Sequence, residues 1–159
     1  MEADTDLFFK AVLSFDLEET EKYLDRGVDV NSKKEGYTAL HFALSLHKPG
    51  FDAKPLVNLL LDRGIDSDLG NGRGNTALHI ACRKGFPDFV KILLDLGVDK
   101  DKKNNYGESA LYIAAQLNNV EITKLLLQAG AITTETNRFG FTPLLKAINE
   151  ILQVTERWP

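Results

Sequence analysis

A few side chains in this 159-residue sequence are of the types that carry chemistry. His79 and Cys82 stand one helical turn apart, and both residue types bind zinc. The stretch Gly70–Gly74 has the glycine content of a phosphate-binding loop. Gly107-Glu108-Ser109 begins like a nucleophile elbow, in which a serine stands on a sharp turn. Metal binding, phosphate binding and acyl transfer are therefore the chemistries to weigh.

Each of these patterns is incomplete. A zinc site needs about four ligands, and no others cluster near His79 and Cys82 in the sequence. No Gly-Lys-Ser/Thr follows Gly74, and the last glycine of the elbow is missing after Ser109. The sequence therefore predicts no catalytic residue, no metal ligand and no cofactor. Cys82 is expected to be a small core residue, and the glycines are expected to form a turn.

The chain contains a sequence repeat, and His79 and Ser109 hold fixed positions within it. Similar strings begin at positions 38, 76, 109 and 142, namely Thr38-Ala39-Leu40-His41, Thr76-Ala77-Leu78-His79, Ser109-Ala110-Leu111-Tyr112 and Thr142-Pro143-Leu144-Leu145. A glycine also ends an apolar segment four times, at Gly27, Gly64, Gly97 and Gly130. Self-similarity at such a regular period is the sequence signature of stacked helical repeats.

Both markers have a physical explanation. The hydroxyl residue before each short apolar run can cap the free N–H groups at the start of a helix. Each glycine stands where a leucine-rich helix must end in a left-handed turn. Small residues such as Ala43, Ala81 and Ala114 let neighbouring first helices approach closely. The stretch Val90–Leu94 has the wide apolar stripe of a second helix packed between neighbours.

The strings and glycines resemble the ankyrin repeat, whose unit is a hairpin-like turn followed by two antiparallel helices. The resemblance covers nearly the whole chain and implies an all-α ankyrin-repeat solenoid of stacked helix-turn-helix units with hairpin-like loops. It also implies that His41 and His79 brace the turns of adjacent units by hydrogen bonds. Tyr112 and Leu145 replace this histidine in later repeats, which a shared catalytic role would not survive.

We expect one domain, 1–159, with about ten helices in five pairs, the last abbreviated. The units are an N-terminal cap at about 1–35, then 36–73, 74–106 and 107–139, and 140–159 as an incomplete unit or C-terminal cap. The second unit has five extra residues around His47–Phe51, between its two helices. The last unit is either part of an excised fragment or closes through Ile151 to Trp158 as a short cap.

Composition narrows the function classes. The formal net charge is −4 and the isoelectric point is about 5.4, which opposes binding to nucleic-acid phosphates. No apolar run approaches the roughly 20 residues that a membrane span needs. Cys82 is the lone cysteine, which suits a reducing compartment. We therefore expect a monomer in the cytoplasm, with a nuclear location open, that neither binds nucleic acid nor inserts into a membrane.

Partners of ankyrin proteins usually lie against the hairpin tips and the exposed side of the first helices. The corresponding positions, which form the predicted partner-binding set, are Lys34, Glu35, Tyr37, Ser45, Leu46, Arg73, Asn75, Arg83, Lys84, Asn105, Tyr106, Glu108, Gln116, Leu117, Arg138, Phe139, Phe141 and Asn149. Tyrosine and arginine are over-represented among binding hot spots. Basic residues gather on the same elements, and we expect a partner segment with acidic and apolar residues.

The function predicted from the sequence is a protein-binding module, an adaptor or scaffold that captures a partner on the concave face formed by hairpin tips and first helices. Two alternatives stay open at this point. The chain could be a targeting or regulatory domain of a larger enzyme or channel. It could also be a small inhibitor similar to the ankyrin inhibitors of Rel-type transcription factors.

Overall fold

The computed structural model describes residues 2–47 and 52–155. The chain divides into two compact units, Met1–Gly72 and Arg73–Pro159, and each is described by itself. The secondary structure of the described residues is nine α-helices and an isolated antiparallel bridge between Lys34 and Tyr37. The predicted all-α repeat fold is confirmed, and the bridge lies in a hairpin tip.

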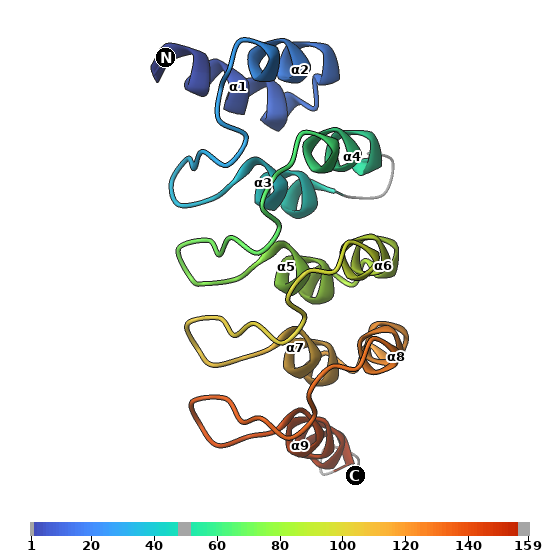
Figure 1. Cartoon of the computed structure of the whole chain (residues 1–159). Coiled ribbons are helices and arrows are strands. Elements are labelled where there is room, and N and C mark those ends of the chain that lie inside the picture. The colour runs from blue at the N-terminus through green and yellow to red at the C-terminus, as the bar shows by residue number, and fades with distance from the viewer. Residues whose placement is uncertain (1, 48–51, 156–159) are drawn as a thin grey trace. The chain divides into compact units, whose positions relative to one another are not determined.

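The first unit contains two helix pairs. Its helices are α1 (Glu2–Ser14), α2 (Leu17–Asp25), α3 (Ala39–Leu46) and α4 (Lys54–Asp62) (Figure 1). The first helices α1 and α3 contact each other, and so do the second helices α2 and α4. Phe8, Phe9, Leu40 and Leu44 fill the core between them and are at most 1% exposed. The pairs therefore stack through like helices.

The second unit has the same arrangement within itself, over three repeats. Its helices are α5 (Ala77–Lys84), α6 (Pro87–Asp95), α7 (Ala110–Gln116), α8 (Val120–Gln128) and α9 (Pro143–Thr155). Within this unit the first helices α5, α7 and α9 form one row and the second helices α6 and α8 form another, with hairpins on the far side of the first helices (Figure 1). Small side chains such as Ala81 and Ala114 are fully buried, which permits the close stacking expected from the sequence.

The predicted caps form in two ways. Ser109 accepts a hydrogen bond from the Tyr112 N–H, at 3.3 Å, at the start of α7. In the histidine-bearing repeats, the side chain of His41 or His79 also takes part, in a capping box with the threonine that precedes its helix. Thr76 donates its backbone N–H to His79 Nδ1 at 3.2 Å, and its hydroxyl lies 2.8 Å from the same nitrogen. The histidine thus helps to cap the N-terminus of its helix.

The predicted left-handed glycines are also present. Gly97 has a φ of +76°, and Gly27, Gly64 and Gly130 have positive φ as well. A β-branched side chain is penalised in that conformation. Each of these glycines follows the end of a second helix and lets the chain turn toward the next hairpin.

The last repeat differs from the predicted pair of helices, because α9 is one helix of 13 residues. The turns that end α5 and α7 contain Gly85 and Asn118, which have φ of +74° and +52°. The corresponding position in the last repeat is Ile151, a β-branched residue that disfavours this conformation, and the helix continues through it. The insertion was predicted around His47–Phe51, and its residues 48–51 lie outside the described part of the chain. Trp158, where the predicted cap ends, also lies outside it.

Candidate partner-binding surface

The hairpins of the second unit are held by buried asparagines. Asn104 is 5% exposed, and its Oδ1 accepts hydrogen bonds from the N–H groups of Tyr106 and Glu108, at 2.9 and 3.0 Å. Asn137 makes the same two bonds in the next hairpin, to Phe139 and Phe141, at 2.9 and 3.1 Å. A side chain that bonds the backbone ahead of it fixes a tight turn. The hairpin tips are therefore rigid and hold their exposed side chains in fixed positions.

Backbone hydrogen bonds connect successive hairpin tips. The Asn105 N–H donates to the Arg73 carbonyl at 3.0 Å, and the Arg138 N–H donates to the Tyr106 carbonyl at 3.1 Å. Gly107 lies at the second of these junctions, where an added Cβ would stand 2.9 Å from the Arg138 nitrogen. The close approach requires glycine there, and it brings residues of the predicted binding set from neighbouring repeats together.

His79 joins two repeats of the second unit. Its Nε2 lies 3.0 Å from the Glu108 carbonyl oxygen, so Nε2 carries the proton and donates. Nδ1 is then the acceptor for Thr76. Burial is the main cause that lowers the pKa of His79 below its usual range. The bracing role that the resemblance implied is present, and both ring nitrogens of His79 take part in hydrogen bonds.

Aromatic side chains stand exposed on these hairpins. Tyr106 and Phe139, three residues before the hydroxyl residue of their repeats, are 46% and 73% exposed. Phe141 is 38% exposed, and Leu117 at the end of α7 is 51% exposed. Exposed apolar groups scattered singly are normal on protein surfaces. Here, however, two rings occupy the same position of two hairpins whose backbones are bonded to each other.

Basic residues of the second unit surround this surface, and some have acidic neighbours. Arg83 lies 3.6 Å from the Glu108 carboxylate, with the arginine side chain 47% exposed. Lys103 lies 2.8 Å from Glu135. The Lys103–Glu135 pair is exposed on both sides, and ion pairs of this kind contribute about 0–1 kcal/mol, so Lys103 can exchange its partner at little cost. Acidic residues such as Asp88, Asp95 and Glu121 lie on the second helices.

The predicted binding residues of the first unit are in less open positions. Lys34 bonds the Asp6 carboxylate at 2.8 Å. Tyr37 is half-buried, with its ring 5.6 Å from that of Phe42. Glu35, which has a φ of +53°, and Leu46, at the end of α3, are exposed, and Ser45 is half-buried. Among the described residues, the first unit therefore exposes less aromatic surface than the second.

Most of the predicted binding residues in the second unit reach solvent. Those exposed are Arg73, Arg83, Lys84, Asn105, Tyr106, Leu117, Arg138, Phe139 and Phe141. Glu108, Gln116 and Asn149 are half-buried. Asn75 is 5% exposed, and its Oδ1 accepts from the Asn104 amide at 2.9 Å. The structure thus gives Asn75 a place in the packing between hairpins, because Asn104 one repeat later needs an acceptor.

The sequence interpretation missed the buried asparagines of the hairpins. Asn71, Asn104 and Asn137 recur at the same place in three successive repeats and are at most 8% exposed. A buried polar residue at a fixed place in every repeat indicates a structural hydrogen bond. The regular recurrence was therefore a signal that could have found them.

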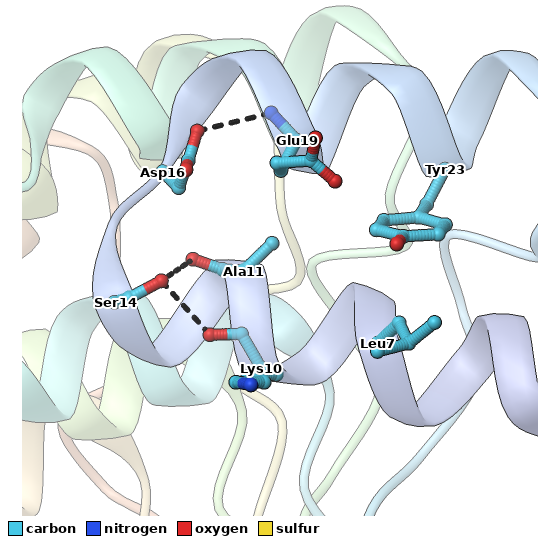
Figure 2. A pocket seen from close by; sticks show the side chains of 7 residues that line it. All are labelled: Leu7, Lys10, Ala11, Ser14, Asp16, Glu19 and Tyr23. Atoms are coloured by element: carbon cyan, nitrogen blue, oxygen red, sulfur yellow. Dashed lines mark hydrogen bonds between the residues drawn. The ribbon is translucent and has the colours of Figure 1, made fainter.

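The lone thiol is buried, and one carboxylate beside the N-terminal pocket serves as a helix cap. Burial raises the pKa of Cys82 to about 12, which leaves its thiol protonated and unreactive. In the first unit, Leu7, Lys10, Glu19 and Tyr23 line a pocket of about 210 Å³ (Figure 2). The Asp16 carboxylate at its edge accepts from the Glu19 N–H at 3.0 Å, as a helix cap. Across the described ranges 2–47 and 52–155, no group of three or more potential metal ligands occurs.

The sequence of this chain matches a family model and several known proteins. A family model described as ankyrin repeats (3 copies) matches residues 8–104, 50–137 and 96–156. Ankyrin repeat protein B18 of Vaccinia virus (strain Ankara) and of Variola virus is 33% identical over 69 residues, 36% of this chain. Human ankyrin repeat domain-containing protein 63 is 38% identical over 68 residues, 43% of this chain. The matches span 12% and 18% of those proteins.

In the parts of the chain that the structure describes, no helix is long and apolar enough to cross a membrane.

Proposed function

We propose that this chain, which belongs to the family of ankyrin-repeat proteins, captures a partner protein on the hairpin tips and first helices of its second unit. Ankyrin repeats are generally protein–protein interaction modules, and members of the family are typically non-catalytic. Their fold does not identify the partner, so the choice of surface has to rest on this chain's side chains.

The observation that carries the proposal is the pair of exposed rings on rigid, connected hairpins. Tyr106 and Phe139 project from tips whose backbones are fixed by Asn104 and Asn137. The Tyr106 carbonyl is also bonded to the Arg138 N–H. Binding to a preorganised surface loses little conformational entropy, and aromatic rings supply a large contact area with few rotamers to fix. These tips are therefore well suited to anchor a partner.

The charge around these rings favours a partner segment that bears acidic residues. Arg83 and Lys84 end α5, and Arg138 stands beside Phe139 in the hairpin. All three are exposed, while the chain as a whole carries a charge of −4. A local positive surface on an acidic protein steers association by complementarity with an acidic ligand. The partner we propose combines apolar side chains for the rings with carboxylates for the cations.

The test compares capture by matched variants. We expect Tyr106→Ala/Phe139→Ala to weaken binding of a captured partner at least tenfold, because the anchors of an interface carry most of its energy. Leu96→Ala is the control, since Leu96 at the end of α6 is 57% exposed and lies on the side of the second helices. Pull-down from lysate with quantitative mass spectrometry identifies the partner, and titration calorimetry with the purified partner measures the loss.

The result that contradicts the proposal is equally specific. If Leu96→Ala abolishes capture while the double variant retains it, the binding surface lies on the second helices. Both variants change exposed side chains, so their melting temperatures should stay close to that of the unmodified chain. Arg83→Ala sharpens the test, because it should weaken binding more at low than at high ionic strength.

A second candidate follows from the length of the relatives. Because the matched segments span 12% and 18% of the viral and human proteins, the repeats could serve as a targeting or regulatory domain of a larger protein. The mass of the full-length protein would decide between this function and a free-standing adaptor. For either protein we propose a cytoplasmic location, supported by the lone, buried Cys82.

A further inference from the structure

Three exposed side chains of the second unit hold the same position in successive hairpins. Arg73, Tyr106 and Phe139 each stand three residues before the hydroxyl residue that precedes the next helix. Their backbones are connected, because the Asn105 N–H donates to the Arg73 carbonyl at 3.0 Å and the Arg138 N–H donates to the Tyr106 carbonyl at 3.1 Å. We call Arg73, Tyr106 and Phe139 the tip row.

The tip row stays exposed when hairpins stack on both sides of it. Tyr106 has a bonded neighbour in each direction, since Asn105 before it donates to one tip and its own carbonyl accepts from the other. Its side chain is nevertheless 46% exposed. Phe139, which is 73% exposed, holds the same position. The exposure of this position therefore does not depend on whether a further repeat follows.

The spacing of the tip row follows from the stacking of the repeats. Each repeat adds one first helix to the row of α5, α7 and α9, and neighbouring helices in this row contact each other. The axes of packed helices are about 8–10 Å apart, so equivalent residues of neighbouring repeats are separated by a similar distance. A polyproline II helix has three residues per turn and rises about 3.1 Å per residue. Its residues i, i+3 and i+6 therefore lie on one face, about 9 Å apart, and match the tip row.

Other backbone conformations match the tip row less well. In a β-strand, residues on the same face recur every two residues, about 7 Å apart, which is shorter than one repeat. In an α-helix, residues i and i+7 are about 10.5 Å apart, which matches the distance. A bound helix, however, also rests on residues i+3 and i+4, and the tip row has one side chain per repeat. The spacing therefore favours a polyproline II segment.

We propose that the tip row binds a proline-rich polyproline II segment of another protein, with an acidic residue against Arg73 and apolar residues three and six positions away against Tyr106 and Phe139. This inference rests on the proposed function, because it gives the conformation and spacing of the partner at that surface. Exposed aromatic rings bind such segments, whose preformed conformation lowers the entropy lost on binding. The guanidinium of Arg73 is a strong donor to a carboxylate.

Two short fluorescein-labelled peptides are the probes. One is Asp-Pro-Pro-Leu-Pro-Pro-Leu, and the other has the reverse order, because the spacing is the same in either chain direction. The control, Asp-Pro-Leu-Pro-Leu-Pro-Pro, has the same composition, but its leucines are two and four positions from the aspartate and point to other faces of the polyproline II helix. We expect one of the two probes to bind the whole chain saturably by fluorescence anisotropy, about tenfold or more tighter than the control.

A charge reversal locates the acidic end of the peptide. Arg73→Glu should weaken the bound probe about tenfold or more, and a probe with arginine in place of aspartate should restore the binding, because the two charges are then exchanged. Lys91→Glu makes the same charge change at an exposed position of α6 and should leave binding of the original probe unchanged. Circular dichroism melts of both variants check that the fold is kept.

Several outcomes overturn the proposal. They are no binding of either probe, equal binding of the probes and the control, failure of the arginine probe to restore binding to Arg73→Glu, and tighter binding of a helical peptide with aspartate and two leucines seven residues apart. None of these decides the proposed function. Loss of partner capture in Tyr106→Ala/Phe139→Ala, together with failure of the probes, would keep the hairpin surface and reject only the polyproline II segment.

Discussion

The fourth and fifth repeats of the chain carry the same markers in the same register but have different neighbours. In the fourth repeat, Leu111 is 2% exposed, and a Cβ on Gly107 would meet the next hairpin. In the fifth, Leu144 is 66% exposed, and a Cβ on Gly140 would meet nothing within 4 Å. The sequence marker is the same in both places. What each residue contributes is set by the repeat stacked on it.

This comparison explains why repeat position alone does not rank residues by importance. Stability in stacked repeats is approximately the sum of the intrinsic stability of each unit and the interfaces between neighbours. Positions of the fourth repeat contribute to two interfaces, and those of the fifth to one among the described residues. Matched substitutions at equivalent positions of the two repeats separate the two contributions.

The largest expected difference concerns the leucine pair. Leu111→Ala should lower the free energy of unfolding by about 3 kcal/mol, because it leaves a cavity under α8 and α9. Leu144→Ala should change it by less than about 0.5 kcal/mol, since an exposed side chain leaves no cavity. Urea unfolding followed by circular dichroism measures both. Equal losses would mean that the fifth repeat is covered as completely as the fourth.

The glycine pair should give a smaller difference. Gly107 and Gly140 have φ of +74° and +79°, so alanine at either position meets the same left-handed strain of about 1–2 kcal/mol. At Gly107 the added Cβ also stands 2.9 Å from the Arg138 backbone nitrogen, which must move. We expect Gly107→Ala to lower the free energy of unfolding by roughly 1–2 kcal/mol more than Gly140→Ala, because the closely packed hairpin junction leaves no space for the added methyl group. Matched urea titrations of the two variants measure this excess. An excess near zero would show that the backbone at the hairpin junction shifts at little cost in free energy.

The fold could be predicted from the sequence because its markers are local. Thr76 and Ser109 start helices through bonds to residues three positions ahead, and Gly97 ends one through its own φ. Such signals need no knowledge of the rest of the molecule. The same holds for Cys82, whose position on the apolar face of α5 predicted its burial.

The binding surface could be predicted less fully, because exposure depends on residues in other repeats. Asn75 and Tyr106 were placed in the predicted set by the same positional rule. Asn75 is buried because Asn104, in the next repeat, donates to it, whereas Tyr106 remains 46% exposed. The single helix of the last repeat was also missed, since α9 continues where the repeat pattern predicted a pair of helices.

The smallest expected effect, a pH dependence, compares His79 with Leu145, its counterpart in the fifth repeat. Burial lowers the pKa of His79 in the folded chain below the ordinary value of about 6.5 that it has when unfolded. The unfolded state therefore binds more protons, and the contribution of neutral His79 is present above about pH 6.5 and is lost as the pH falls below it. Protonation would also put a hydrogen on Nδ1, which accepts from the Thr76 N–H.

We expect the free energy of unfolding to fall between pH 7 and pH 5 less steeply in His79→Gln than in the unmodified chain. His41 and His47 are present in both proteins, so their contributions cancel in the difference. Leu145→His is the matched control, because a histidine at this half-exposed position of the fifth repeat keeps an ordinary pKa and adds no slope. Identical slopes for His79→Gln and the unmodified chain would show that the brace to Glu108 tolerates a charged imidazole.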